Sequence, residues 1–450
     1  MKIKVNSNWS AEREYVLNQI FLEFLGIEIE IEKYENAPQN HYTIILNNSE
    51  ILINDSFFAD PNNSLSYLRI DNIPTSIKWE RLNYSENKLP IIYGDSDIDT
   101  QVVNGRIIIK CGLDIFASIY FMLTRWEEYV IPDRDKHGRF EGVNSTAYIN
   151  NFLEIPVVNY YLDVLWNMLK KCDQSILKKQ RKYKLHLTHD VDNIKKYTNP
   201  YRFIKSFIGQ VIKGNLLNAI FMLPQYIKVM LGYGIDPYYT FEYIISLSNR
   251  YNLRSIFFFL CQLDNEYDSR YNVTSNEVKT LINLIESNKC DIGIHPSYKS
   301  SECDELLKKE LTRYRKIFNK SKIISRQHYL KLSIPKTFVN LSQNLVSVDY
   351  SLGYADKVGF RCGVCYPYRL FDFIDRKQLD IYEYPLLVMD NTIFDYNSYN
   401  FIEAKEKIYK ICKQVRAFQG DFVFLWHNTR FFNLGESGFK FYESVVSQIC

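Results

Sequence analysis

From about residue 180 to its end, the chain alternates short apolar strands with helices, and this alternation constrains the fold more than any other feature. The predicted strands are Leu185–Val191, Ser255–Cys261, Asp291–His295, Ile323–Tyr329, Leu345–Tyr350, Tyr382–Val388 and Phe422–His427. Between them, apolar residues recur at every third or fourth position, which predicts helices. Regular alternation over about 270 residues predicts a parallel α/β sheet, open or closed into a barrel. In both cases active sites lie at the C-terminal ends of the strands.

The residues before this region carry a mixed pattern. Tyr42–Leu46 and Ile51–Ile53 flank Asn47-Asn48 as the strands of a β-hairpin do. Apolar periodicity predicts helices near residues 10–25, 113–130 and 156–171, and the polar stretch from Asp173 to Lys184 predicts a linker. We therefore predict a mixed α/β domain of unknown role over residues 1–178, followed by a second domain over residues 179–450.

The composition excludes several classes of protein. The chain has 55 Lys and Arg against 52 Asp and Glu, a net charge of +3 that gives no reason to expect nucleic-acid binding. Charged residues such as Glu12 and Arg13 interrupt the apolar runs near the N-terminus, unlike in a signal peptide, and no stretch approaches the ~20 apolar residues of a membrane span. Together with nine cysteines, an odd number, this predicts a cytoplasmic protein with free thiols.

Histidines and aspartates gather where predicted strands end. His295, His328 and His427 close three strands, and Asp190 and Asp192 close a fourth. A single histidine at such a position is more often a hydrogen-bonded structural residue. Three of them beside an aspartate pair, at the edge where such folds build their sites, favour a functional site instead.

Strand periodicity indicates which of these side chains share a face. Asp190 and Asp192 point to one side of their strand, whereas His189 points to the other and is expected to be structural. Arg326 and His328 likewise share a face of their strand. Acidic, imidazole and guanidinium groups are costly to bury together unless they pair or bind a metal. One Asp with two His suits a divalent metal that leaves positions open for water and substrate.

Such a set suits metal-assisted hydrolysis of an amide or an ester. A second Asp two residues from the ligand can take a proton from the attacking water, and a separate His can protonate the leaving group.

These residues form motifs that resemble those of the polysaccharide deacetylase (NodB-type, carbohydrate esterase) superfamily over roughly residues 184–450. The motifs are Thr188-His189-Asp190-Val191-Asp192, Gly293-Ile294-His295-Pro296-Ser297, Arg326 and Leu425-Trp426-His427. The resemblance implies a (β/α)7-type barrel and a metal-dependent de-N-acetylase or deformylase activity on sugars, with zinc as the expected metal. The segment 124–129, Thr-Arg-Trp-Glu-Glu-Tyr, is similar to part of an uncharacterised domain that precedes such bacterial barrels.

The resemblance also implies roles for individual residues. Asp190 corresponds to the catalytic base, Asp192 and His295 to metal ligands, Arg326 to the residue that orients the base, and His427 to the catalytic acid. The chain departs from the family at Lys299, where a second metal-binding histidine is usual. Because His328 faces inward by periodicity, we expect it to be the third metal ligand.

The departure at Lys299 leaves more than one function open. The expected function is a metal-dependent amide hydrolase that removes an N-acetyl or N-formyl group from an amino sugar in bacterial surface polysaccharide or capsule biosynthesis. One alternative is a catalytically inactive deacetylase-like protein that binds glycans or assists their assembly. Another is an O-acetyl esterase, which uses the same metal and base.

Two further residues are candidates for contacting the substrate. Arg361 follows Gly359-Phe360 and could bind a carboxylate or phosphate, although a surface salt bridge fits its pattern as well. Asp390 follows a predicted strand and could bind sugar hydroxyls, or it could cap a turn.

Residues 193–235 form an insertion between the first motif and the helix that should follow it. The insertion contains no Asp or Glu, and apolar residues alternate with its basic ones. The basic residues are Lys195, Lys196, Arg202, Lys205, Lys213 and Lys228. One interpretation is a solvated helix pair whose apolar side packs on the barrel. The other is a surface that meets anionic lipid or a lipid-linked sugar, which would place the protein at the inner face of the membrane.

Overall fold

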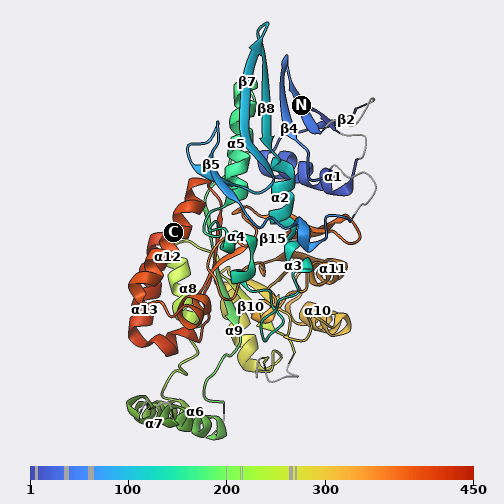
Figure 1. Cartoon of the computed structure of the whole chain (residues 1–450). Coiled ribbons are helices and arrows are strands. Elements are labelled where there is room, and N and C mark those ends of the chain that lie inside the picture. Colours follow the sequence, from blue (N-terminus) through green and yellow to red (C-terminus); the bar gives the residue numbers. More distant parts are fainter. Residues whose placement is uncertain are drawn as a thin grey trace.

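The computed structural model describes the chain except residues 6–8, 35–39, 59–64, 199, 213, 215, 263–266 and 269–270, and the side chains of residues 202, 210, 217, 218 and 221. Lys213 and the side chain of Arg202 therefore lie outside the described part. Two large sheets occupy separate stretches of the described chain, one within residues 2–113 and one within residues 184–425 (Figure 1). The predicted division near residue 178 falls between them, and we retain it as a proposal.

In the described residues, the N-terminal sheet has six strands in the order β2-β1-β3-β4-β8-β7. Its strands are β1 (Lys2–Val5), β2 (Glu30–Lys33), β3 (His41–Leu46), β4 (Ser49–Asn54), β7 (Gly94–Val103) and β8 (Arg106–Leu113), beside a separate hairpin of β5 (Lys78–Arg81) and β6 (Lys88–Ile91). The helices of this part are α1 (Ala11–Asn18), α2 (Ile115–Thr124), α3 (Glu127–Val130), α4 (Thr146–Ile149) and α5 (Val157–Cys172). The hairpin predicted around Asn47-Asn48 is confirmed as β3 and β4.

The second sheet has nine strands in the described part of the chain, in the order β14-β15-β13-β12-β11-β10-β9-β17-β16. They are β9 (Lys184–Val191), β10 (Ile256–Leu260), β11 (Asp291–His295), β12 (Ile323–Ser325), β13 (Val346–Asp349), β14 (Tyr368–Asp372), β15 (Lys377–Glu383), β16 (Leu386–Met389) and β17 (Asp421–Leu425). Every neighbouring pair is parallel except β14 with β15. The predicted parallel α/β class is therefore confirmed.

This sheet is curled into an open barrel. Only Tyr384 and Pro385 separate β15 from β16, yet β15 pairs with β13 and β16 pairs with β17 at the opposite end of the strand order. So short a connection keeps the two ends close together. Val348 of β13, Leu386 of β16 and Leu425 of β17 accordingly share one buried apolar cluster.

The strand count corrects part of the sequence prediction. Tyr382–Val388 was expected to be one strand, but Pro385 lacks an N–H for the ladder and the chain changes partners there. A (β/α)7-type barrel would have seven strands. The described residues instead form eight parallel strands and one antiparallel edge strand. Strand β12 also ends at Ser325, earlier than expected, and a short helical turn over His328–Leu330 follows it.

Helices cover the outer face of the curled sheet, with α12 and α13 on one side and α10 and α11 on the other (Figure 1). The helices of this part are α8 (Phe241–Arg250), α9 (Asn276–Ser287), α10 (Asp304–Phe318), α11 (Lys336–Gln343), α12 (Phe401–Ala417) and α13 (Arg430–Ile449). Their buried residues, such as Leu281 and Ile408, join the main apolar core.

The insertion folds into two antiparallel helices, α6 (Pro200–Ile212) and α7 (Leu216–Met230), which we call the helical hairpin. Figure 1 shows it below the rest of the molecule, at the end of two extended segments. None of the helices among the described residues combines the length and apolar character that crossing a bilayer requires.

The N-terminal part and the curled sheet meet through a buried cluster of charged groups, which we call the junction cluster. Arg125 contacts Glu127, Glu128 and the hydroxyl of Tyr354, and Arg361 pairs with Glu128 from the other side. Arg125 and Glu127 are fully buried. The segment that resembles the uncharacterised domain therefore attaches to the barrel through paired charges.

Candidate metal centre

Three side chains converge at the C-terminal ends of the strands. Asp192 directly follows β9, His295 ends β11, and His328 begins the turn that follows β12. Oδ1 of Asp192 lies 3.6 Å from Nε2 of His295 and 3.5 Å from Nε2 of His328. One ligand atom from each residue lies within 4.8 Å of the others. The structure thus brings together the three residues that we predicted as metal ligands.

The spacing of these atoms fits a divalent ion. In a tetrahedral site with ligand bonds of about 2.0–2.1 Å, neighbouring ligand atoms lie about 3.3–3.4 Å apart. In the described structure, Oδ1 of Asp192 is buried and has no hydrogen-bond partner. A buried carboxylate oxygen without a partner is costly, and a cation among the three ligands would remove that cost. Two imidazoles and one carboxylate form a donor set typical of zinc.

Both histidines are oriented by hydrogen bonds at their other ring nitrogen. Nδ1 of His295 contacts the carbonyl oxygen of Arg326, and Nδ1 of His328 lies 2.9 Å from Oδ1 of Asp268. Since a carbonyl or an ionised carboxylate only accepts, each Nδ1 carries the proton and each Nε2 presents its lone pair to the cluster. Burial lowers the pKa of His295 to about 3, which keeps its ring neutral.

Asp190 lies beside the cluster in an ion pair. Nη1 of Arg326 donates a hydrogen bond of 3.0 Å to Oδ1 of Asp190 and another of 2.8 Å to the hydroxyl of Thr188. The second carboxylate oxygen, Oδ2, lies 3.6 Å from Nε2 of His295. Arg326 therefore fixes one oxygen of Asp190 and leaves the other directed toward the proposed ligands.

His427 also lies beside the cluster, with Nε2 3.8 Å from Oδ2 of Asp192. Its Nδ1 lies 2.7 Å from Oδ1 of Asp390, and Nε of Arg430 donates a hydrogen bond of 3.3 Å to Oδ2 of Asp390. Burial alone would lower the pKa of His427, but the carboxylate of Asp390 raises it to about 9. His427 is therefore a cation near neutral pH and can give up a proton.

The structure places the two residues predicted to contact substrate in other surroundings. Asp390 is fully buried, and its carboxylate is occupied by His427, Arg430 and the N–H of Asn391. Arg361 is buried in the junction cluster, where its guanidinium contacts Glu128. Both groups have internal partners, and direct contact with a substrate stays a prediction for each. Asp390 is placed to orient His427.

His189 has partners outside the cluster, and Lys299 is a surface residue. Nδ1 of His189 donates to the carbonyl oxygen of Trp426, and its ring stacks on Phe257 in the outer core. Burial lowers the pKa of His189 to about 4. Lys299 is exposed. The structural role predicted for His189 agrees with these contacts.

Aromatic side chains that sequence reasoning missed lie beside His328. Tyr329 follows His328, with ring centroids 4.8 Å apart, and Tyr267 stacks on Tyr298 at 4.5 Å. His137 from the N-terminal part joins them through a 3.2 Å contact between its Nδ1 and the hydroxyl of Tyr298. The position of Tyr298 beside the second motif was the available sequence signal. No sequence pattern around His137 indicates that it lies beside Tyr298.

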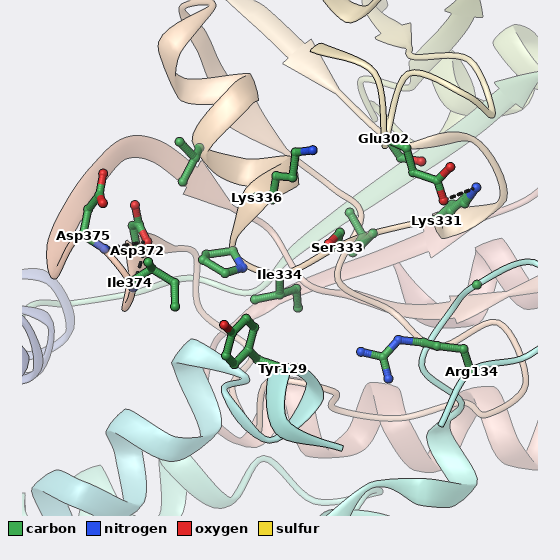
Figure 2. Close-up of a pocket in the computed structure, with 15 residues that line it drawn as sticks. Tyr129, Arg134, Glu302, Lys331, Ser333, Ile334, Lys336, Asp372, Ile374 and Asp375 are labelled. Carbon is green, nitrogen blue, oxygen red and sulfur yellow. Dashed lines mark hydrogen bonds and ion pairs between the residues drawn. The ribbon is translucent and has the colours of Figure 1, made fainter. Parts of the chain in front are cut away.

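Next to this aromatic group, a cavity of 610 Å³ lies between the N-terminal part and the barrel loops. Figure 2 shows Tyr129 and Arg134 of the N-terminal part facing Ser333, Ile334 and Lys336 of the barrel. None of the proposed metal ligands lines this cavity, so it is distinct from the candidate centre. Its walls nevertheless come from the same two parts of the chain.

In a comparison with known protein families, residues 1–174 match the model of a family of unknown function, DUF7033. Among solved structures, the chain is similar to one described as "putative polysaccharide deacetylase from Mycobacterium smegmatis". The sequence identity is 13%, the TM-score is 0.38, and the match covers 60% of this chain and 85% of the other. A search of curated proteins returned no match.

Proposed function

We propose that this chain is a metal-dependent hydrolase that cleaves the amide bond of an N-acylated amino sugar. One observation carries the proposal. Asp192, His295 and His328 present ligand atoms close to one another, Asp190, held by Arg326, lies 3.6 Å from His295, and His427 lies 3.8 Å from Asp192. Metal-assisted hydrolysis needs a base on one side of the reacting carbonyl and an acid on the other.

The residues divide the proton transfers between them. Oδ2 of Asp190 accepts a proton from water as the water oxygen bonds to the carbonyl carbon, which produces a tetrahedral intermediate. His427 then donates its Nε2 proton to the amide nitrogen as the C–N bond breaks. The products are a free amine and a carboxylic acid. A divalent cation held by Asp192, His295 and His328 would polarise the carbonyl group and lower the pKa of water at the site.

The proposed substrate is an amino sugar that carries an acetyl or formyl group, within the synthesis of a bacterial surface polysaccharide, and the proposed metal is zinc. The aromatic rings of Tyr267, Tyr298 and Tyr329 support a sugar substrate, because apolar sugar faces pack on aromatic side chains in ligand sites. The exposed position of Lys299 and the convergence of His328 support an active enzyme over an inactive glycan-binding protein.

The test combines metal analysis with product detection. The purified protein is loaded with zinc, its bound metal is measured, and acetate and formate release is followed from N-acetylated, N-formylated and O-acetylated amino sugars. We expect about one zinc per chain and release from an N-acylated substrate. A metal-loaded protein that releases neither acid would support a glycan-binding protein, and release from O-acetyl sugars alone would support an esterase.

Ligand variants test the metal shell. His295→Ala and His328→Ala should both lose metal, whereas Lys299→Ala should retain it as the matched control, because Lys299 is exposed in the loop after His295. If His328→Ala retains full metal while His295→Ala loses it, His328 is not a ligand.

A further inference from the structure

We propose that the helical hairpin, α6 and α7, docks the protein on the surface of an anionic lipid bilayer. The hairpin would lie in the plane of the interface, with its outer apolar side chains among the lipids and its lysines at the headgroups.

The hairpin has a small core of its own. Phe203 of α6 and Met222 of α7 are buried together with Tyr197, and they form a cluster separate from the main core. The ring of Phe203 stacks on that of Tyr226 at a centroid distance of 4.1 Å. The inner faces of the two helices therefore pack on each other and hold the hairpin together.

The outer faces of the same helices are apolar and exposed. The exposed residues are Ile204, Ile208, Val211 and Ile212 on α6, and Leu216, Ile220, Leu223, Ile227 and Met230 on α7. Their spacing of three and four positions places them in one stripe along each helix. Because these side chains are exposed, they contradict the first interpretation of the insertion, in which its apolar side packs on the barrel.

This exposure is concentrated in one place. Among the described residues, 26 large hydrophobic side chains are exposed, and 13 of them lie between Tyr201 and Ile235. A soluble protein rarely exposes a contiguous apolar surface of this kind unless the surface binds a membrane or another protein.

The charge of the segment selects an anionic partner. Residues 193–235 hold six Lys and Arg and no Asp or Glu, and of these Lys195 pairs with Glu277 and Lys196 lies over the ring of Phe432. Lys205 and Lys228 are exposed and directly follow Ile204 and Ile227 of the apolar stripes. A second copy of the hairpin would meet it with like charges, whereas an anionic bilayer offers opposite charges and an apolar interior together.

The base of the hairpin is tied to the loop that carries His427. The side-chain amide of Asn428 donates hydrogen bonds of 2.9 Å to the carbonyl of Asn193 and 2.8 Å to the carbonyl of Tyr238. These two acceptors lie on the segments that enter and leave the hairpin. Docking would therefore hold the candidate centre near the lipid surface, where, if the proposed function is correct, an amino sugar attached to a lipid would reach it.

Vesicle co-sedimentation tests this proposal with the full chain. The protein is mixed with vesicles of phosphatidylcholine alone or with about one third phosphatidylglycerol, at low and high salt. We expect binding to the anionic vesicles that weakens with salt and little binding to the neutral ones, because the attraction between lysines and anionic headgroups is screened by salt. Failure to bind the anionic vesicles would overturn the proposal.

Two variants separate the hairpin from general surface effects. The combined change Ile204→Ser, Ile208→Ser, Ile220→Ser and Ile227→Ser should weaken vesicle binding at least about tenfold. The matched control changes four exposed apolar residues elsewhere, and it should bind as the unaltered protein does. The control changes are Val102→Ser, Ile149→Ser, Leu177→Ser and Ile402→Ser. Equal binding by both variants would overturn the proposal.

Further measurements distinguish the other outcomes. Hydrolysis of a soluble amino sugar should be the same for the hairpin variant and the unaltered protein, so loss of docking and loss of activity are scored separately. If the unaltered protein is a dimer that the hairpin variant converts to monomer, and vesicles are not bound, the surface joins two copies instead of meeting lipid.

Discussion

The junction cluster and the candidate metal centre both bury several charged groups, but they differ in how those groups are satisfied. In the junction cluster, the carboxylate oxygens of Glu127 and Glu128 all accept hydrogen bonds, from Arg125, Arg361 and the N–H of Thr146. In the metal centre, Oδ1 of Asp192 is buried without a partner and faces two imidazole lone pairs.

This difference separates structural charge from functional charge. The carboxylates of the junction cluster are occupied by internal donors, although Nη1 of Arg125 is buried without a partner among the described residues, and paired charges of this kind hold two parts of a chain in position. A buried carboxylate oxygen without a partner calls for an explanation, and at Asp192 the two imidazole nitrogens beside that oxygen point to a bound cation. The sequence assigns Asp192 to the metal and proposes Arg361 as a substrate contact or a salt-bridge residue, and in the structure Arg361 pairs with Glu128.

The largest expected effect is on catalysis, from Asp190→Asn. The amide is nearly the same size but cannot accept the proton of the attacking water, so the turnover rate should fall about 10²–10⁴-fold. Metal content should stay unchanged, since Asp192, His295 and His328 remain, whereas thermal stability should fall because the buried Arg326 loses its counter-charge. Rate measurements and elemental analysis check this. Loss of metal from this variant would mean that Asp190 is itself a metal ligand.

The next effect is on stability, from Glu128→Gln in the junction cluster. Removing this charge leaves Arg361 buried without its carboxylate partner and Arg125 with Glu127 alone, which should lower the free energy of unfolding by about 3–5 kcal/mol. Metal content per folded chain should not change. Urea unfolding measures the effect, with the exposed Glu14→Gln as a control expected to change stability by less than about 0.5 kcal/mol. A stable Glu128→Gln variant with impaired turnover would show that the junction cluster acts in catalysis.

A smaller effect is expected from Asp268→Asn, which alters the group that orients His328. The weaker hydrogen bond to Nδ1 should reduce metal affinity about 10–100-fold without removing the ligand itself. Competition with a chelator measures the affinity. Affinity equal to that of the unaltered protein would mean that the imidazole of His328 needs no support from Asp268.

The smallest effect is a shift in pH dependence from Asp390→Asn. His427 acts as an acid only while protonated, and its pKa of about 9 keeps it protonated at neutral pH. Without the Asp390 carboxylate this pKa should fall, so the alkaline limb of kcat/KM should move to lower pH by about one unit or more. The pH profile of kcat/KM checks this. An alkaline limb that stays in place would show that another group supplies the proton.

The sequence by itself determined the features that depend on local periodicity. Alternation of strands and helices predicted the parallel sheet, and the period of two along β9 separated Asp190 and Asp192 from His189. Polar residues at the ends of parallel strands predicted where the site would form, because those ends lie along one edge. These inferences need only neighbours in the chain.

Tertiary structure decided everything that depends on contacts between distant segments. The turn after Ser325 aims His328, Asp268 orients it, and His137 reaches the site from the N-terminal part. Packing also decided that Arg361 pairs with Glu128 and that the apolar stripes of the hairpin stay exposed. The physical reason is that a buried charge finds its partner, and an apolar face its covering residues, among segments that only the tertiary fold brings together.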